Sequence, residues 1–160
     1  MRNYLLLFLA FICSQTLGET ADAVRVEKSE RKMYLMRGQE VIRSYDVSLG
    51  DVPVGHKTTE GDEKTPEGDY VLDWRNPNSS YHLSIHISYP NVDDRNQARR
   101  RGVSPGGEIF IHGLPNGMGL LGSLFKGRDW TDGCIAVNSN EEMEEIWALV
   151  PNGTPISINP

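Results

Sequence analysis

The sequence has little cysteine, no excess of positive charge and no long apolar segment, and each of these features excludes a class of protein. Two cysteines in 160 residues cannot build the disulfide framework of a small secreted domain. A net charge of −6, from 16 basic and 22 acidic residues, argues against sequence-independent nucleic-acid binding. The apolar run at residues 4–13 is too short for a bilayer, which needs about 20 residues. No repeat with a period of about 20–50 residues is visible, which excludes solenoids and propellers.

The first 18 residues have the pattern of a secretory signal peptide. Arg2 is their only charged residue, residues 4–13 are apolar, and a short polar stretch ends at Gly18. We expect cleavage after Gly18, with sites near Ala21 or Ala23 as alternatives. The alternative interpretation of the segment is a buried N-terminal strand. The pattern predicts an exported protein, secreted or periplasmic, with no transmembrane anchor in its mature part.

Removal of this segment leaves residues 19–160, which we expect to form one domain and a monomer. They carry 15 basic residues (16 less Arg2) and 22 acidic ones, a net charge of −7, and a single cysteine, Cys134. One cysteine cannot form an internal disulfide, and a free thiol in an oxidising compartment is a liability unless it is buried or used. Cys134 is therefore the first residue to examine for chemistry.

The patterning of the remaining chain predicts a largely β fold. Sixteen glycines and nine prolines favour a loop-rich protein over a helical bundle. Apolar–polar alternation predicts a meander over residues 24–47 with a tight turn at Gly38, then a long loop at 50–68. Further strands are expected at 69–74, 83–88, 108–112, 134–137 and 155–158. Two helices are expected, a polar one at 93–101 and an amphipathic one that starts at Ser139 or Asn140 and ends at Pro151.

His112 and Cys134 form the strongest candidate for chemistry. A cysteine nucleophile needs a base, usually histidine, and an ion pair with it would lower the thiol pKa below about 8.5. His112 ends a predicted strand and Cys134 follows a loop 22 positions later, so the two side chains can meet across neighbouring strands. Gly133 permits a sharp turn that exposes the sulfur and backbone amides for an oxyanion. From residue type alone, the alternative is a small buried apolar side chain.

Four motifs that follow one another along the chain extend this argument. They are MYLMRGQ at residues 33–39, TPEGDY at 65–70, IHG at 111–113 and TDGCI at 131–135. Together they resemble the L,D-transpeptidase catalytic domain, also called the YkuD domain, over most of the mature chain. The resemblance implies a mainly β fold, with mixed sheets in a sandwich-like arrangement and a helix in the C-terminal region. It also implies an L,D-transpeptidase-like catalytic domain over residues 19–160.

The same resemblance implies the roles of individual residues. Cys134 would attack the carbonyl between the diamino acid and the terminal D-residue of a peptidoglycan tetrapeptide stem, and so form a thioacyl-enzyme. His112 would act as general base and then as general acid. Amides near Gly133 and Cys134 would hold the oxyanion, and the Gly113 carbonyl would orient the imidazole. The implied partner is the peptide stem of peptidoglycan, and no cofactor is implied.

The catalytic residues leave the reaction open. An amine acceptor gives transpeptidation, whereas water gives hydrolysis of a stem linkage, as in an L,D-carboxypeptidase. A thiol hydrolase that acts outside the wall is a further possibility. A non-catalytic wall-binding module is the alternative of a different class, and the intact Cys134 and His112 argue against it.

Four residues are predicted to contact the substrate: Thr131, Asp132, His86 and Arg128. The family often has histidine at the position of Asp132, which here either orients a histidine or caps the turn. It often has asparagine or arginine at the position of Ala136, where an arginine would bind a substrate carboxylate. Arg128 or the arginines at 99–101 can substitute, although a solvated helix face is the simpler interpretation of that cluster.

Three other features allow two interpretations each. His82 and His86 lie on one face of a strand with only Ser84 between them on that face, and they resemble a metal half-site with His56 or an acid as third ligand. We favour a strand that borders the cleft and predict no metal. The glycine-rich residues 116–127 lack the pattern of a phosphate loop, and we expect their apolar side chains to pack inward. Trp130 is expected in the core rather than in the wall of the site.

Overall fold

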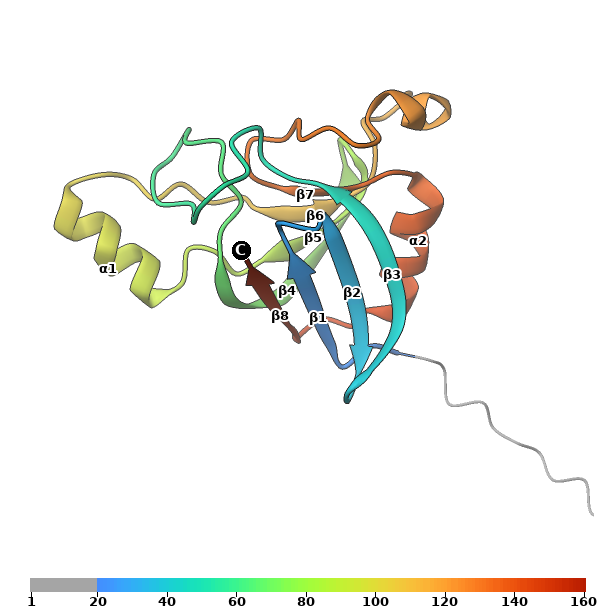
Figure 1. The fold of residues 1–160 in the computed structure, drawn as a ribbon, viewed down its shortest axis with the longest axis horizontal. Coiled ribbons are helices and arrows are strands. Elements are labelled where there is room, and N and C mark those ends of the chain that lie inside the picture. Colours follow the sequence, from blue (N-terminus) through green and yellow to red (C-terminus); the bar gives the residue numbers. More distant parts are fainter. Residues whose placement is uncertain (1–19) are drawn as a thin grey trace, which may run out of the picture.

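The computed structural model describes residues 20–160 as a closed barrel of eight strands with two α-helices outside it (Figure 1). The strands are β1 (Ala23–Glu27), β2 (Lys32–Arg37), β3 (Glu40–Ser48), β4 (Gly68–Ser79), β5 (His82–Ile87), β6 (Phe110–His112), β7 (Ile135–Val137) and β8 (Thr154–Asn159). Their order around the barrel is β1-β2-β3-β7-β6-β5-β4-β8. The predicted signal peptide lies outside the described residues.

The closed barrel corrects the expectation of a sandwich-like arrangement of sheets. The strand β1 pairs in parallel with β8, and β6 pairs in parallel with β7, while the other neighbours are antiparallel. The pairing of β1 with β8 joins the first strand to the last one and leaves no open sheet edge between them. Alternation along a strand specifies which side chains point inward, but a sandwich and a barrel share that alternation.

The predicted meander is confirmed, and its turn has a physical cause. Strand β2 ends at Arg37 and β3 begins at Glu40, and these two residues pair. Gly38 and Gln39 therefore form a two-residue turn between the strands. Gly38 has φ of +58°, the left-handed conformation that such hairpin turns favour. The strand β4 runs further than the prediction, from Gly68 to Ser79, because its irregular pairing with β5 continues past Trp74.

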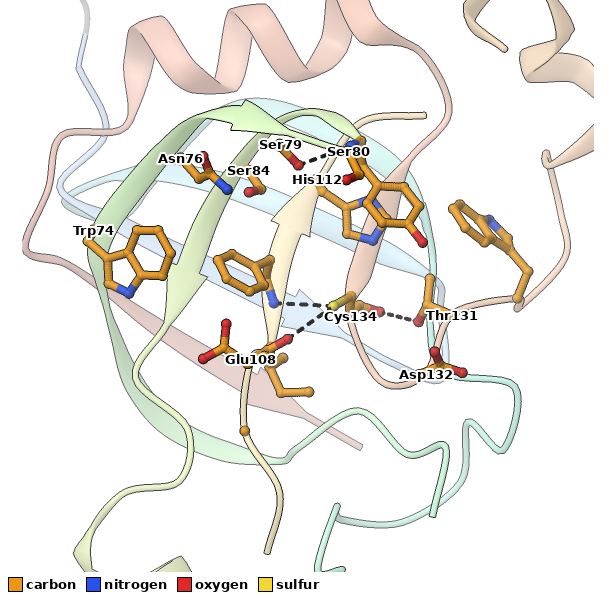
Figure 2. A pocket seen from close by; sticks show the side chains of 15 residues that line it. Trp74, Asn76, Ser79, Ser80, Ser84, Glu108, His112, Thr131, Asp132 and Cys134 are labelled. Atoms are coloured by element: carbon orange, nitrogen blue, oxygen red, sulfur yellow. Dashed lines mark hydrogen bonds between the residues drawn. The ribbon is translucent and has the colours of Figure 1, made fainter. Parts of the chain in front are cut away.

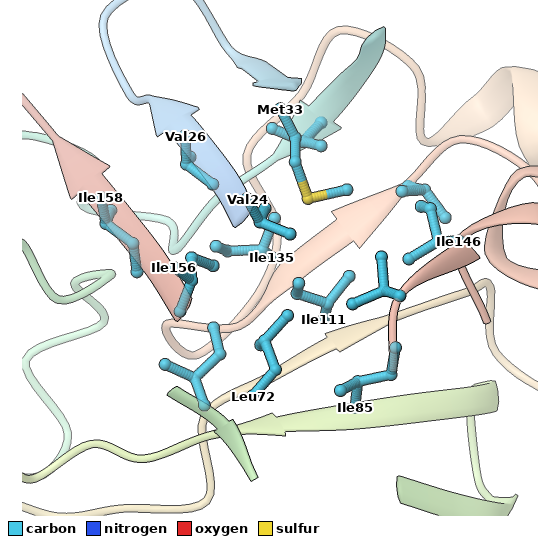
Figure 3. Close-up of a cluster of buried hydrophobic side chains, with 14 of the residues drawn as sticks. Val24, Val26, Met33, Leu72, Ile85, Ile111, Ile135, Ile146, Ile156 and Ile158 are labelled. Carbon is cyan, nitrogen blue, oxygen red and sulfur yellow. The ribbon is translucent and has the colours of Figure 1, made fainter. Parts of the chain in front are cut away.

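The hydrophobic core fills the barrel interior (Figure 3). Every second residue of the strands points inward, as the alternation predicted, and the side chains that meet there are almost all branched aliphatic ones. The most buried include Val24, Val26, Leu72, Ile85, Ile111, Ile135, Ile156 and Ile158. The opposite face of β4, β5 and β6 is therefore free to carry polar residues.

Both predicted α-helices are present. The helix α1 (Val92–Arg101) starts with a capping box between Asn91 and Asp94 and ends at Gly102 in the left-handed conformation. The helix α2 (Asn140–Leu149) is capped by the Ser139 hydroxyl and contributes Met143 and Ile146 to the core. In residues 20–160 no helix has the length and apolarity to cross a membrane.

The long loop, predicted at residues 50–68 and found at residues 49–67, is held to the barrel by a buried lysine. The Lys28 ammonium donates to the carbonyls of Gly55 (2.7 Å) and Thr65 (3.0 Å) and pairs with Glu67 at 2.7 Å. The Thr65 hydroxyl in turn accepts the Gly50 amide at 3.0 Å. This loop packs against the segment that carries Cys134, because Gly50 forms a bridge with Thr131.

Candidate active site

Strand register brings His112 and Cys134 to one face of the sheet. In the parallel pair β6–β7, Ile111 lies opposite Ile135 and His112 opposite Ala136. Ile111 and Ile135 point into the core, so His112 and the residue before Ile135 point to the outer face. The Cys134 sulfur accordingly lies 3.4 Å from the Phe110 amide of β6.

These two residues line a cavity of about 540 Å³ (Figure 2). Its volume is in the range of small-ligand sites in proteins. Its other lining residues come from β4, β5, β6, the turn between β4 and β5, the loop before β6 and the loop before β7. They are Trp74, Asn76, Ser79, Ser80, Tyr81, Ser84, Gly107, Glu108, Ile109, Phe110, Trp130, Thr131 and Asp132.

The Cys134 thiol is held as a neutral donor. It donates to the Glu108 carbonyl at 3.6 Å, while the Phe110 amide donates to the sulfur. Burial raises the pKa of the thiol from 9.0 to about 11, because a thiolate loses solvation there. Glu108 has φ of +56°, a strained conformation for a residue with a side chain, and it follows Gly106 and Gly107.

The His112 imidazole is buried, oriented and uncharged. Its Nδ1 lies 2.7 Å from the Gly113 carbonyl oxygen, which can only accept a hydrogen bond, so Nδ1 carries the proton and Nε2 is free to act as a base. The Tyr81 ring lies over it, with 4.4 Å between ring centroids. Burial lowers the pKa of His112 from 6.5 to about 4. A Cβ at Gly113 would come within 2.9 Å of Asn140 Oδ1, which leaves no room there for a side chain.

The two pKa shifts point away from a resting ion pair. A thiolate–imidazolium pair needs a lowered thiol pKa and a raised imidazole pKa, and burial shifts both groups in the opposite directions. The neutral forms of Cys134 and His112 therefore share the cavity. The expectation of a thiol pKa below about 8.5 is replaced by one in which the proton leaves the sulfur during attack.

Hydrogen bonds and a close backbone contact hold the turn that carries Cys134 in place. Thr131 donates its hydroxyl proton to the Cys134 carbonyl (2.7 Å) and accepts the Gly133 amide (3.2 Å). Asp129 accepts the Leu49 amide at 2.9 Å and is bound by the Arg31 guanidinium. Gly133 has φ of +124°, and a Cβ there would lie 2.6 Å from the Lys64 carbonyl oxygen. Glycine at 133 is thus required by both conformation and space.

The structure brings two of the four predicted substrate contacts to the cavity. Thr131 and the exposed Asp132 line it. His86 lies behind the lining, stacked on Trp74 and bound to Asp73. Arg128 lies elsewhere, in a hollow formed with Arg31, Asp46 and Asp129 among others.

The position at which the family often has arginine or asparagine is occupied here by Ala136. Ala136 is fully buried in β7. The arginines at 99–101 form the last turn of α1, as the solvated-helix interpretation expected. Within residues 20–160, the cavity lining contains no lysine or arginine.

The three histidines that were weighed as a metal site face separate carboxylates. His82 pairs with Glu144 (2.8 Å), His86 with Asp73 (2.7 Å) and His56 with Asp94 (3.1 Å). In the described part of the chain, no three His, Cys, Asp or Glu side chains are grouped to hold a metal ion. The strand that carries His82 and His86 does border the cavity, through Ser84.

Two expectations about the loop between His112 and Cys134 are wrong. Its short 3₁₀ helix (Gly119–Leu124) leaves its leucines exposed instead of packed inward, and Leu120 is fully exposed. Trp130 lines the cavity wall, with its ring 5.7 Å from that of His112 and 5.0 Å from that of Phe125. A loop that projects from the barrel gives its apolar residues little to pack against (Figure 1).

Sequence reasoning missed three residues of the site. Tyr81 covers the imidazole, Trp74 lines the cavity from β4, and Glu108 supplies the carbonyl that holds the thiol. Alternation along β4 carries a signal for Trp74, because Leu72 points inward and residue 74 must then point outward. No comparable signal exists for Glu108, whose role depends on a backbone carbonyl.

Comparison with known proteins identifies the family of the chain. The L,D-transpeptidase catalytic domain family, YkuD, matches residues 21–158. YafK of Escherichia coli (strain K12), named as a candidate L,D-transpeptidase, is 32% identical over 97 residues, which are 56% of this chain and 37% of YafK.

Solved structures resemble the chain over most of its length. The helical cell shape determining protein Pgp2 of Campylobacter jejuni has 27% identity and a TM-score of 0.62, over 85% of this chain and 46% of its own. Bd1075 of Bdellovibrio bacteriovorus has 26% identity and a TM-score of 0.58, over 90% and 49%. An L,D-transpeptidase from Xylanimonas cellulosilytica, 17% identical with a TM-score of 0.54 over 89% and 62%, shares the fold.

The chain spans between about a third and a half of the length of YafK, Pgp2 and Bd1075. The family match covers most of the chain, and its barrel resembles that of solved L,D-transpeptidases. The chain therefore belongs to the L,D-transpeptidase catalytic domain (YkuD) family.

Proposed function

We propose that the protein is an exported cysteine L,D-transpeptidase that acts on the tetrapeptide stems of peptidoglycan through a thioacyl-enzyme on Cys134. The observation that carries this proposal is the shared cavity, in which His112 has a free Nε2 and Cys134 lies on the same face of adjacent strands. Family membership supplies the reaction class. The pattern of residues 1–18 supports export.

The reaction would begin with neutral groups. His112 Nε2 takes the thiol proton as the sulfur attacks the carbonyl carbon between the diamino acid and the terminal D-residue. The tetrahedral intermediate then collapses, Nε2 returns the proton to the leaving amine, and a thioester remains on Cys134. Because the Gly113 carbonyl holds the Nδ1 proton, the imidazolium formed in this step keeps its hydrogen bond and its orientation.

The developing oxyanion would be bound by backbone amides of the Cys134 turn. The Gly133 amide already donates to the Thr131 hydroxyl, so we assign the main role to the Cys134 amide. The turn is rigid because Thr131, Asp129 and the 49–67 loop all hold it. Such preorganised donors are worth about 10²–10³ in rate in other acyl-transfer enzymes.

A second hollow favours an amine over water as the acceptor. Its volume is about 470 Å³, and it shares Gly107, Glu108 and Asp132 with the first cavity. Glu60 and Glu63 also line it, while its lysine, Lys57, is engaged by Asp62 at 2.8 Å. Carboxylates here would attract an ammonium group to the thioester. Hydrolysis, as in an L,D-carboxypeptidase, is the alternative outcome of the same acyl-enzyme.

The test is incubation of the protein, and of Cys134→Ala and His112→Gln variants, with disaccharide-tetrapeptide muropeptides, followed by mass analysis. We expect dimers linked through the diamino acid with the wild type alone, and a thioester adduct on Cys134. Release of the terminal D-residue without dimers would establish hydrolysis instead. Unchanged muropeptides with added amine acceptors would overturn the proposed activity and favour a wall-binding role or another substrate.

A further inference from the structure

One end of the cavity is formed by a tryptophan that is exposed yet held in place. Trp74 is 41% exposed on the outer face of β4, where it lines the cavity (Figure 2). Its indole stacks on the His86 imidazole, with 5.2 Å between centroids and 24° between planes. The Phe110 ring meets the indole edge-on at 5.3 Å. An exposed indole whose back is packed against two rings presents one free, flat face.

A second contact fixes the ring behind the indole. His86 Nδ1 lies 2.7 Å from Asp73 Oδ1, so the imidazole is bound by the residue that precedes Trp74 on the same strand. His86 also contacts Phe110, with 5.1 Å between ring centroids. The indole therefore loses little side-chain freedom when a ligand covers it, which lowers the entropic cost of binding.

The register of the sheet connects this aromatic face with the candidate nucleophile. Asn76 of β4 lies opposite Ser84 of β5, and Ser84 lies opposite His112 of β6. These three side chains form a polar row that crosses the cavity floor from the strand of Trp74 to the imidazole. In the adjacent row, His86 lies opposite Phe110, whose amide reaches the Cys134 sulfur.

The chemistry at this end suits an uncharged ligand with a flat apolar face and hydroxyl or amide groups at its edge. Asn76 and Ser84 offer hydrogen bonds without charge, and Asp73 is engaged by His86. No lysine or arginine among the described residues lines the cavity to neutralise a carboxylate. A sugar ring has this character: its axial C–H groups carry partial positive charge and pack on the negative face of an indole.

We propose that Trp74, with Asn76 and Ser84 beside it, binds a neutral sugar ring of the glycan to which the peptide stem is attached. This inference rests on the proposed function and extends it, because it makes the saccharide part of the substrate. His86 is a positioning residue, since it holds the indole without contacting the sugar. A stem attached to its sugar would then bind more tightly than the free peptide.

The test compares two ligands by calorimetry in the Cys134→Ala background, where no turnover occurs. One ligand is the disaccharide-tetrapeptide, and the other is the same tetrapeptide without sugar. We expect the disaccharide form to bind at least tenfold more tightly. Trp74→Ala should reduce this ratio to within twofold and leave the Kd of the free peptide nearly unchanged. The matched control is Val71→Ala, an exposed apolar residue of the same strand outside the cavity lining, which should keep the ratio.

Two further variants separate positioning from general damage. His86→Phe keeps a ring behind the indole and should retain most of the preference, whereas His86→Gln keeps a polar group without a ring and should lose it. Equal affinity for the two ligands, an equal loss for both in Trp74→Ala, or no binding of either would overturn the inference. If binding depends on the sugar but the wild-type protein, which keeps Cys134, shows no turnover, the result would contradict the proposed function alone. Turnover without sugar preference would contradict this inference alone.

Discussion

Burial determines the resting state of the two reactive side chains. Cys134 and His112 both lose solvent, and each is stabilised in its neutral form, with the thiol donating to a carbonyl and the imidazole donating through Nδ1. An enzyme with this arrangement keeps its thiol protected until a substrate carbonyl occupies the cavity. In the oxidising compartment that we propose for the protein, that property would protect Cys134, because the thiolate is the form that is oxidised.

The reactivity of the free thiol tests this description. The rate of Cys134 alkylation by iodoacetamide should rise with pH and reach half its maximum near the thiol pKa of about 11, above the ordinary value of 9.0. At pH 7 the protein should then react at least tenfold more slowly than a free cysteine peptide measured alongside it. A plateau below pH 8 would show a resting thiolate and contradict the neutral pair.

Gly133 should tolerate no side chain. In Gly133→Ala the new Cβ would lie 2.6 Å from the Lys64 carbonyl oxygen, and a φ of +124° is strained for alanine. We expect a fall of at least about 100-fold in thioester formation, because the Cys134 turn must move. The free energy of unfolding should fall by about 2–4 kcal/mol.

The matched control for this variant is Gly127→Ala. Gly127 also has a positive φ, +75°, but a Cβ there has nothing within 4 Å. It should lose about 1 kcal/mol of stability and no activity. Equal effects of the two substitutions would mean that conformation alone, and not the contact with Lys64, makes Gly133 necessary.

At the level of elements, sequence patterns predicted what depends on neighbouring residues and missed what depends on distant ones. Alternation located the strands, and capping residues located α1 and α2 within a residue or two. Closure of the barrel was missed because it depends on the pairing of β1 with β8, which no local pattern encodes. The motif around Cys134 indicated the candidate site, but the residues that hold the Cys134 turn in place, Arg31 and the 49–67 loop, lie far away in the sequence.

The long loop depends on a residue from another element, and this dependence can be measured. Lys28 is 2% exposed and makes three hydrogen bonds that hold the loop beside the Cys134 turn. Lys28→Met should cost about 2–4 kcal/mol in urea unfolding, since two carbonyls and the Glu67 carboxylate lose their partner. Lys32→Met removes only the solvent-exposed ion pair with Asp46 and should leave the urea midpoint of unfolding almost unchanged. Similar losses in the two variants would exclude Lys28 as the anchor of the loop.

For the whole molecule, the barrel separates stability from chemistry. Its interior is filled mainly by aliphatic side chains, while the candidate site occupies the outer face of β4, β5 and β6 and the loop before β7. The two meet at His112, which is a buried titratable group of the barrel wall as well as the candidate base. The pH dependence of folding between neutral pH and about pH 4.5 should therefore include a contribution from this side chain.

The sign of this dependence follows from the pKa of His112, which is about 4 in the folded protein and 6.5 as a reference for the unfolded chain. Its contribution to stability is fully present above pH 6.5 and is lost as pH falls toward 4, because the unfolded chain binds the proton more readily. Two pKa units between pH 6.5 and 4.5 correspond to about 2–3 kcal/mol. Asp62 titrates lower, since Lys57 and three backbone amides reduce its pKa to about 2.

Urea unfolding at pH 7.5 and 4.5 measures this loss directly. His112→Gln should lose about 2–3 kcal/mol less than the wild type between these two values, because it has no buried imidazole to protonate. His82→Gln, which removes a half-exposed surface histidine outside the cavity lining, controls for the loss of a histidine as such. If the wild type and His112→Gln lose stability in parallel, the imidazole binds a proton equally well in the folded and the unfolded protein. Burial would then not lower the pKa of His112, and the description of a buried imidazole held in its neutral form would be wrong.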